Sequence, residues 1–243
     1  MRLINKKENL NYSETKSFFE KRAKKYNENN PYSVTMYQDN NAELVEKRNK
    51  YETDKLLKLI NLNEDSKVLD LACGIGRWAD AIGNNIERYV GVDFSEGLID
   101  IAKKRNKNPK AEFITGSSTE IDSLLNKDDE FNRVLIVGLL MYLNDEDVTK
   151  VFEQAEKFCS EHATICIREP IGITDRLTLK EFYSEELKDN YNAIYRTDAE
   201  FKQLMQATLF EKGFKIKQEG FLFDDDALNN RKETSQYFYI LER

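Results

Sequence analysis

The sequence predicts a single doubly wound α/β domain around a seven-stranded, mostly parallel sheet. Short apolar runs alternate with helical segments between residues 67 and 212. Such alternation is typical of parallel strands joined by right-handed helical crossovers, with helices on both faces. The last two apolar runs, 214–223 and 234–241, follow one another with no helical pattern between them. This favours an antiparallel strand at the edge of the sheet.

Length and composition indicate an ordinary globular chain. It has 243 residues, of which 40% are hydrophobic and 33% charged, and this length allows a sizeable core. The net charge is −7, and the basic residues are scattered among acidic ones. Nucleic-acid binding normally needs a concentrated basic face, so we do not expect a nucleic-acid partner. No apolar run approaches the roughly 20 residues of a membrane span.

The N-terminus and the cysteines favour a cytoplasmic location. The segment Met1–Glu8 becomes polar at once and lacks the apolar core of a signal peptide. The three cysteines, Cys73, Cys159 and Cys166, are odd in number and have no metal-ligand spacing, which suits a reducing compartment. We expect no metal site. The only histidine, His162, precedes the fifth strand and is expected in a surface loop rather than as a general base.

The first 62 residues are predicted to form a helical lid ahead of a core at 63–243. Helical spacing at 13–26 places Phe18, Phe19 and Ala23 on one side, and a second helix is predicted at 41–60. The Asn-rich stretch at 27–30 separates the two. In this fold ligands bind beyond the carboxyl ends of the strands, so the loops there are the expected site.

The core is predicted to contain five strands and four helices before the final strand pair. Ser95 is a plausible N-cap and Gly213 a C-cap. Residues 171–197 allow no simple assignment and look like an insertion after the fifth strand. The predicted strands are 67–72, 88–93, 111–115, 133–137 and 164–168, and the helices start near 77, 95, 145 and 198.

A glycine-containing turn follows the first strand and is the main functional signal. Asp70 ends the strand, and Gly74 and Gly76 lie in the turn, where glycine lets the backbone approach a ligand closely. Asp93 ends the second strand, where a carboxylate can accept both hydroxyls of a ribose. The pattern therefore predicts a nucleoside-containing cofactor.

The same turn has an alternative interpretation. Residues 74–79 match the dinucleotide fingerprint G-x-G-x-x-A, with Asp93 near the position of its acid. Asp70 would repel a pyrophosphate, whereas it would attract an amine. An NAD(P)-dependent oxidoreductase is thus the weaker alternative.

Residues 66–168 resemble the class I S-adenosylmethionine-dependent methyltransferases. The family motif is Asp-x-Gly-x-Gly-x-Gly, and Ala72 replaces its first glycine. The resemblance implies S-adenosylmethionine as cofactor and S-adenosylhomocysteine as product. It implies that Asp70 and the glycine turn hold the methionine end, that Asp93 holds the ribose, and that Phe94 packs on the adenine or ribose.

The resemblance also implies cofactor contacts from the N-terminal segment and from later strands. Ser117 and Ser118 stand where the family often has an adenine-binding Asp, although a plain serine turn fits equally. Tyr37 and Arg48 are candidates near the methionine carboxylate, although Arg48 also fits an i,i+4 pair with Glu52. The full predicted set is Tyr37, Arg48, Asp70, Ala72, Cys73, Gly74, Gly76, Trp78, Asp93, Phe94, Ser117, Ser118, Val137 and Gly138.

The insertion at 169–197 is expected on the acceptor side of the cleft. Its polar and aromatic character suits a small hydroxylated or phosphorylated acceptor better than a lipid. Arg176 and Arg196 could hold a phosphate in a forked geometry, or the segment is a solvated helical cap. Glu169 and Tyr142 are the candidate bases, and Tyr195 and Arg196 complete the predicted catalytic set.

The strings Arg168-Glu169-Pro170 and 191–197 look similar to bacterial methyltransferases of surface-polysaccharide pathways. This likeness implies O-methylation of a sugar, a nucleotide-linked sugar, or a phosphoramidate- or phosphate-bearing group during capsule or surface-glycan biosynthesis. A cofactor-binding protein without catalysis is a further alternative. Such a protein would bind S-adenosylhomocysteine but would lack a cavity for an acceptor beside the sulfur atom of that ligand. The sequence carries no signal for an oligomeric state.

Overall fold

The computed structural model describes residues 1–229 and 231–243 and contains two sheets. The larger has seven strands in the order β4-β3-β2-β5-β6-β10-β9. The pairs between β2, β3, β4, β5 and β6 are parallel, whereas β10 is antiparallel to both of its neighbours. Its strands are β2 (Lys67–Leu71), β3 (Arg88–Asp93), β4 (Ala111–Thr115), β5 (Phe131–Val137), β6 (Cys159–Gly172), β9 (Lys215–Phe221) and β10 (Thr234–Glu242).

The predicted seven-stranded, mostly parallel sheet is confirmed, with one correction. The antiparallel strand β10 does not lie at the edge, because it pairs with β6 on one side and with β9 on the other. The edge strand on this side of the sheet is therefore β9, most of whose residues are exposed. In addition, β6 extends well beyond the predicted 164–168 at both ends.

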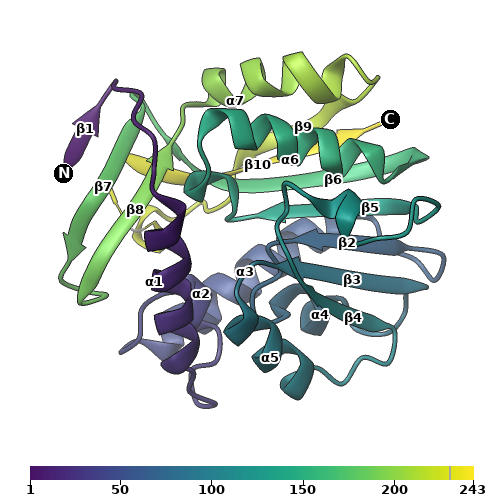
Figure 1. Cartoon of the computed structure of the whole chain (residues 1–243), viewed down its shortest axis with the longest axis horizontal. Coiled ribbons are helices and arrows are strands. Elements are labelled where there is room, and N and C mark those ends of the chain that lie inside the picture. Colours follow the sequence, from purple (N-terminus) through teal and green to yellow (C-terminus); the bar gives the residue numbers. More distant parts are fainter. Residues whose placement is uncertain (230) are drawn as a thin grey trace.

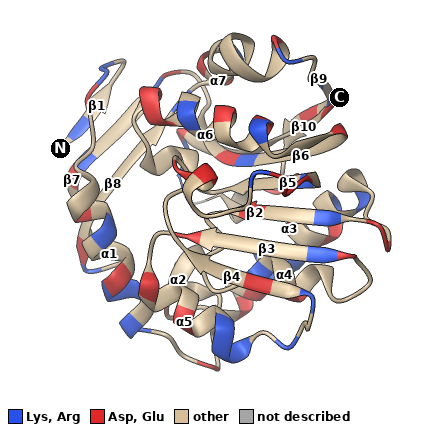
Figure 2. Ribbon diagram, turned by 45° about the vertical axis from the view of Figure 1, so that its right-hand side comes forward, with Lys and Arg blue, Asp and Glu red and all other residues tan. Residues whose placement is uncertain are grey.

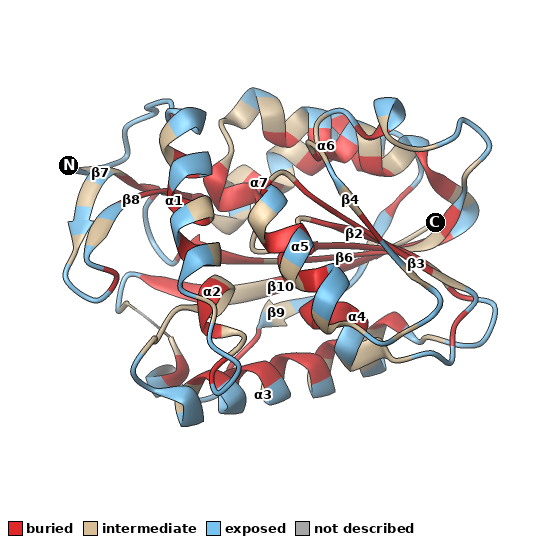
Figure 3. Cartoon of the chain, turned by 60° about the horizontal axis from the view of Figure 1, so that its bottom comes forward, coloured by how far each residue is buried: buried red, intermediate tan, exposed pale blue. Residues whose placement is uncertain are grey.

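Helices cover both faces of the large sheet, which is buried between them (Figure 3). On one face, α6 and α7 pack their apolar sides against β2, β3, β5 and β6. On the other face, α3, α4 and α5 do the same. The helices are α3 (Ala42–Ile60), α4 (Arg77–Ile82), α5 (Glu96–Arg105), α6 (Asp145–Lys157) and α7 (Asp198–Met205), and a π-helical turn at Gln206–Phe210 continues α7.

The helix ends follow their sequence signals. Ser95 caps α5, because its side chain accepts a hydrogen bond from the Leu98 N–H. Thr197 and Glu200 form a reciprocal capping box at α7. Gly213 has φ +91° where the chain turns from the helix toward β9. Basic and acidic segments alternate along the outer helices (Figure 2). None of the helices in the described part of the chain is both long and apolar enough to cross a bilayer.

The N-terminal segment and the insertion form one unit beside the large sheet (Figure 1). The short strand β1 (Arg2–Ile4) pairs with β7 (Leu177–Ser184), which pairs with β8 (Asp189–Tyr195). Helix α1 (Tyr12–Lys24) packs on β8 and α5, and the short α2 (Ser33–Met36) follows it. The predicted helical lid is thus incomplete, because a strand precedes its helices. The helical-cap alternative for 169–197 is wrong, because β7 and β8 form a β-hairpin there.

Candidate active site

A cavity opens at the carboxyl ends of β2, β3, β5 and β6, under the N-terminal helices and the hairpin. It joins segments that lie far apart in the sequence. The N-terminal part contributes Phe19, α2 and α3, the large sheet contributes the turns after its strands, and the hairpin contributes β8. The segment between β9 and β10 closes the side next to α3. The loops after parallel strands therefore form the site, as the fold class predicts.

The glycine turn forms one wall of the cavity. Gly74 has φ +56°, and a Cβ atom there would lie 2.9 Å from Cγ2 of Thr35. The N-terminal segment therefore rests directly on the turn. Gly76 has φ +77° and is the N-cap of α4, but it does not line the cavity. Its role is conformational, since a Cβ atom there would meet the Phe113 ring at 2.9 Å.

Ala72, which replaces the first glycine of the family motif, adopts φ +68°. An L-residue in this region costs about 1–2 kcal/mol, part of which glycine gives back through its greater freedom in the unfolded chain. We expect Ala72→Gly to stabilise the protein by about 0.5–1 kcal/mol, seen as a rise in Tm of about 1–4 °C. Gly74→Ala is the matched control and should be destabilising. An unchanged or lower Tm for Ala72→Gly would show that Ala72 is not strained.

Asp93 lies at the cavity wall with both carboxylate oxygens facing backbone donors. One oxygen accepts from the Gly74 N–H at 2.9 Å, and the other accepts from the Ser95 N–H at 2.9 Å. Burial raises the pKa of Asp93 to about 6, although both backbone hydrogen bonds lower it. Each oxygen retains a lone pair for a further donor, which suits two vicinal hydroxyl groups.

Asp70 lies beneath the turn and does not line the cavity. One of its oxygens accepts a hydrogen bond from the Tyr89 hydroxyl, and the other has no partner among the described residues. Burial raises the pKa of Asp70 to about 7. The sequence interpretation placed Asp70 at the methionine end of the cofactor. In the structure it lies behind the residues that line the cavity, and that role stays a prediction.

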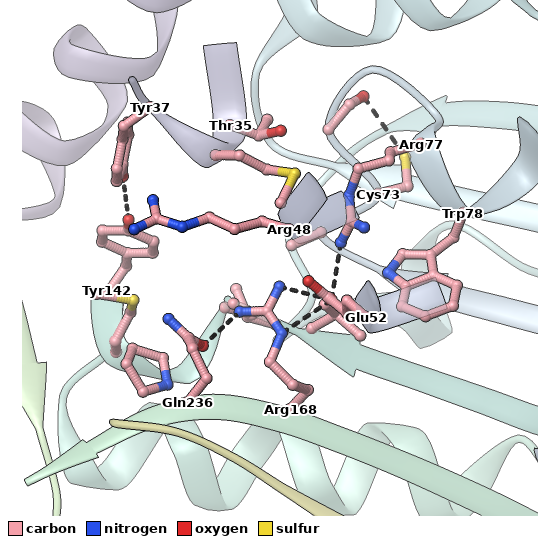
Figure 4. A pocket seen from close by; sticks show the side chains of 18 of the residues that line it. Thr35, Tyr37, Arg48, Glu52, Cys73, Arg77, Trp78, Tyr142, Arg168 and Gln236 are labelled. Atoms are coloured by element: carbon pink, nitrogen blue, oxygen red, sulfur yellow. Dashed lines mark hydrogen bonds and ion pairs between the residues drawn. The ribbon is translucent and has the colours of Figure 1, made fainter. Parts of the chain in front are cut away.

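Three arginines and one glutamate form the wall that α3, α4 and β6 contribute (Figure 4). Oε1 of Glu52 accepts from Nη2 of Arg77 and from Nε of Arg168, both at 2.9 Å. Burial would raise the pKa of Glu52, but the charges and hydrogen bonds of Arg168 and Arg77 outweigh it and lower that pKa. Arg168 also donates to Oε1 of Gln236 at 3.0 Å.

Arg48 is the third arginine of this wall and has no ion pair in the described part of the chain. Its residue is 5% exposed, its Nε has no hydrogen-bond partner there, and burial lowers the pKa of its guanidinium. Glu52, which the sequence offered as its i,i+4 partner, binds Arg77 and Arg168 instead. A buried guanidinium without an anion is costly, so this side chain is suited to bind a negatively charged group.

Four tyrosines from three separate segments form what we call the tyrosine cluster. Tyr37 follows α2, Tyr142 lies in the short 3-10 turn Leu140–Tyr142 after β5, and Tyr191 and Tyr195 lie on β8. The Tyr142 hydroxyl hydrogen-bonds to those of Tyr37 and Tyr191, the latter at 3.1 Å. Burial raises the pKa of Tyr37 to about 12 and those of Tyr142 and Tyr191 well above their usual value.

Tyr37 reaches the cavity through an unusual backbone. Its φ of 64° and ψ of −155° lie in a region that is essentially reserved for glycine. Strain of this kind persists only where the surrounding structure enforces it and is common at functional sites. In Figure 4, Tyr37 points down toward Tyr142, and Arg48 extends across the cavity toward this pair.

Glu169 and Arg196 hold the loop after β5 from beneath and do not line the cavity. Glu169 accepts hydrogen bonds from the backbone N–H groups of Leu139, Leu140 and Met141 at 2.7–3.2 Å. Arg196 donates to the carbonyls of Leu140 and Leu143. Both side chains are fully buried, so neither meets an acceptor as the catalytic assignment required.

The predicted phosphate fork is also not formed, because Asp145 binds Arg176 and Arg196 together. Ser117 and Ser118 lie outside the cavity lining, and Ser117 bonds to Thr119 as in a serine turn. Of the predicted residues, those that line the cavity are Tyr37, Arg48, Ala72, Cys73, Gly74, Trp78, Asp93, Phe94, Val137, Gly138, Tyr142 and Tyr195.

The cavity lining also includes residues that were absent from the predicted set, among them Glu52, Arg77, Arg168, Gln236 and Tyr191. Arg168 stands beside Glu169 at a strand end, and that position was the available signal for it. Gln236 lies on the antiparallel strand β10, opposite Pro170, so only the strand pairing reveals its place.

Comparison with known proteins gives a methyltransferase domain at residues 68–161. Phosphoethanolamine N-methyltransferase of Triticum aestivum is 30% identical over 121 residues, 49% of this chain and 24% of that protein. Demethylmenaquinone methyltransferase of Bacillus licheniformis is 32% identical over 90 residues, 35% of this chain and 38% of that protein. The chain thus spans about a quarter to two fifths of these curated relatives.

Solved structures share the fold at low sequence identity. Phosphoethanolamine N-methyltransferase 1 of Haemonchus contortus, in complex with phosphoethanolamine and S-adenosylhomocysteine, matches with a TM-score of 0.69 and 15% identity, over 93% of this chain and 47% of that chain. Magnesium protoporphyrin IX methyltransferase of Synechocystis with bound S-adenosylmethionine matches with a TM-score of 0.61 and 13% identity, over 96% and 93%. Residues 68–161 therefore match a methyltransferase domain, and the chain shares the class I fold with solved methyltransferases that bind S-adenosylmethionine or S-adenosylhomocysteine.

Proposed function

We propose that this chain, which carries a class I methyltransferase domain, transfers the methyl group of S-adenosylmethionine to a small polar acceptor bound at the tyrosine cluster. The observation that carries the proposal is one cavity with two chemically different regions. The glycine turn, Asp93 and Phe94 form one region, which we call the cofactor end, and Tyr142, Tyr191 and Tyr195 form the other, which we call the acceptor end. The two regions meet at Phe19, whose ring packs on both Phe94 and Tyr142. A cofactor and an acceptor can therefore meet inside it.

The residues present fit the cofactor. Asp93 offers free lone pairs to the ribose hydroxyls, and Phe94 offers an aromatic ring beside them. The unpaired Arg48 offers a guanidinium to the methionine carboxylate, in a charge-assisted hydrogen bond. When bound, the cofactor supplies an activated methyl group on a sulfonium. The chain's own contribution is to orient the two reactants and to exclude water.

The acceptor end suits a hydroxylated or phosphorylated molecule. Phenolic hydroxyls of high pKa remain neutral and can donate hydrogen bonds to acceptor oxygens. Within this proposal we retain the narrower hypothesis of O-methylation in capsule or surface-glycan biosynthesis. The alternative of a cofactor-binding protein without catalysis is weaker. It predicts no space for an acceptor, whereas the tyrosine cluster lines the same cavity as the proposed cofactor residues.

Calorimetry tests the cofactor assignment directly. The purified chain should bind S-adenosylhomocysteine with a micromolar or lower Kd and should not bind NAD. Asp93→Ala should weaken the binding of S-adenosylhomocysteine by at least about tenfold, since a charged hydrogen-bond acceptor is lost. Preferential binding of NAD would instead support the oxidoreductase alternative.

Cofactor affinity should depend on pH through Asp93. Its ionised form accepts hydrogen bonds from the ribose, and its pKa in the free protein is about 6. Protonation below that pH competes with the cofactor, so affinity for S-adenosylhomocysteine should fall about tenfold between pH 7.5 and pH 5. In Asp93→Asn this dependence should disappear. A pH dependence that survives the substitution would assign it to another group.

Radiolabelled methyl transfer tests the activity. S-adenosylmethionine carrying a tritiated methyl group is incubated with sugar phosphates, nucleotide-linked sugars and phosphoethanolamine. The last is included because two of the relatives above carry its name. Transfer to at least one of these supports the proposal. Tight cofactor binding with transfer only to apolar acceptors would contradict the acceptor class.

A further inference from the structure

In the described part of the chain, the cavity lining offers no side chain that is placed to serve as a general base. Among the described lining residues, Glu52 has a lowered pKa and is bound by two arginines. Asp93 is engaged by two backbone amides at the cofactor end. Burial raises the pKa values of Tyr37, Tyr142, Tyr191 and Cys73, so these side chains hold their protons at neutral pH. A neutral alcohol, which gains from a base, is therefore poorly served here.

The cavity is also positively charged. Three guanidinium groups line it, from Arg48, Arg77 and Arg168, against the two carboxylates of Glu52 and Asp93. S-adenosylmethionine adds one further positive charge, because its sulfonium and ammonium groups outnumber its single carboxylate. In a partly dehydrated cavity such an excess favours a negatively charged partner and disfavours an ammonium ion.

We propose that the methyl acceptor is an anion and that the methyl group goes to its anionic oxygen, of the phosphate or carboxylate type. This inference rests on the proposed function and deepens it. A lone pair of the anionic oxygen forms the O–CH3 bond while the S–CH3 bond breaks, and the electron pair of that bond stays on sulfur. No proton moves. The acceptor loses one negative charge, and the sulfonium becomes a neutral thioether.

Arg168 is placed to hold the anion. Glu52 and Gln236 fix its guanidinium from two sides, and its Nη1 lies 3.4 Å from the position of a Cβ atom at Gly138. Glycine at 138, with φ +68°, leaves that space open. Glu52 is shared with Arg77, so it neutralises only part of the charge of Arg168. The hydroxyls of the tyrosine cluster can supply the remaining donors.

Four probes that share one phenyl ring separate the possible nucleophiles. Phenylphosphonate and benzoate are anions, benzyl alcohol is neutral, and benzylamine is a cation at neutral pH. With tritiated S-adenosylmethionine, we expect methyl esters of phenylphosphonate or benzoate, formed at least about tenfold faster than any product of the other two. The position of the methyl group is read by NMR.

The pH profile gives a second readout. Above about pH 7.5 the anionic probes are ionised, and a reaction without proton transfer should show a flat rate up to about pH 9. Tyr142→Phe should keep this flat profile. A rate that rises with pH and loses that rise in Tyr142→Phe would make Tyr142 a base and would overturn the inference.

The role of Arg168 is tested by binding as well as by turnover. Arg168→Gln should weaken phenylphosphonate binding to the S-adenosylhomocysteine complex by about tenfold or more in calorimetry. Arg243→Gln is the matched control, because Arg243 pairs with Glu156 at the opposite end of β6 and should leave binding unchanged. Equal effects of the two substitutions would remove Arg168 from the site.

The failure of this inference is distinguishable from failure of the proposed function. If S-adenosylhomocysteine does not bind, the proposed function itself fails. If it binds and methyl transfer occurs only to benzyl alcohol or benzylamine, the anionic nucleophile is wrong. If it binds and no anionic probe is either bound or methylated, the anion site is wrong while the cofactor assignment stands.

Discussion

Replacing Glu52 with glutamine is expected to lower the free energy of unfolding by about 3–5 kcal/mol. The single carboxylate of Glu52, which is buried, compensates the buried Arg77 and the partly buried Arg168. Removing it leaves both cations without an anion, which is the costly way to break a buried ion pair. For a chain of this length the Tm should fall by roughly 10 °C. Thermal and urea unfolding of the free protein measure both values.

Glu156→Gln provides the matched control. Glu156 also pairs with an arginine, Arg243, but both side chains are more than a fifth exposed. Exposed pairs contribute about 0–1 kcal/mol, so the control should unfold near the wild type. The low pKa of Glu52 adds a pH test. Its stabilisation is present above its unfolded-state pKa and is lost as pH falls through the lower folded-state pKa. The difference between wild type and Glu52→Gln should therefore narrow in acid, and a difference that widens would contradict this account.

The regular part of the fold was predictable because its signals are local. The strands at 67–71, 88–93 and 111–115 are short apolar runs, and α3 and α5 have apolar residues at helical spacing. Their boundaries agree with the sequence within a residue or two. Helices cover both faces of this parallel sheet, so its strands are buried on both sides. Strands of this kind have continuous apolar runs in the sequence.

The remaining elements depend on pairing between distant segments. β1 has only three residues and is a strand because it pairs with β7, far along the chain. The hairpin does carry a period of two, with Leu177 and Leu179 on one strand and Tyr191, Ala193 and Tyr195 on the other. Its polar neighbours and the bulge between Leu179 and Phe182 weaken that pattern. The insertion of β10 between β6 and β9 leaves no local sequence signal at all.

The site residues divide in the same way, into those with a local sequence signal and those that depend on contacts between distant segments. Gly74, Asp93 and Gly138 were found because parallel strands bring their carboxyl ends to one edge of the sheet. The arrangement around Glu52 was missed because ion pairs between α3, α4 and β6 follow no spacing rule. The i,i+4 rule suggested Arg48 as the partner of Glu52, but arginines of other elements took that place. Among the described residues, Arg48 is left without an ion pair as a result.

Arg48→Met is expected to have opposite effects on cofactor binding and on stability. The guanidinium of Arg48 is buried and has no anion in the described residues, so methionine should leave the free protein at least as stable as the wild type. The substitution also removes a charge-assisted hydrogen bond to the methionine carboxylate. The affinity for S-adenosylhomocysteine should therefore fall by roughly 10- to 100-fold. Calorimetry measures the affinity, and thermal unfolding with and without ligand measures the stability.

Arg77→Met is the control that separates the two effects. Arg77 lines the same cavity but is paired with Glu52, so its loss should destabilise the free protein. A merely structural role for Arg48 would make both substitutions destabilising, and a role at the acceptor would leave the affinity for S-adenosylhomocysteine unchanged. If Arg48 binds an anionic group of the cofactor, Arg48→Met should have a Tm equal to or higher than that of the wild type without ligand. Adding S-adenosylhomocysteine should then raise the Tm of Arg48→Met less than that of the wild type. The unpaired arginine then represents a binding site that is already organised before its ligand arrives.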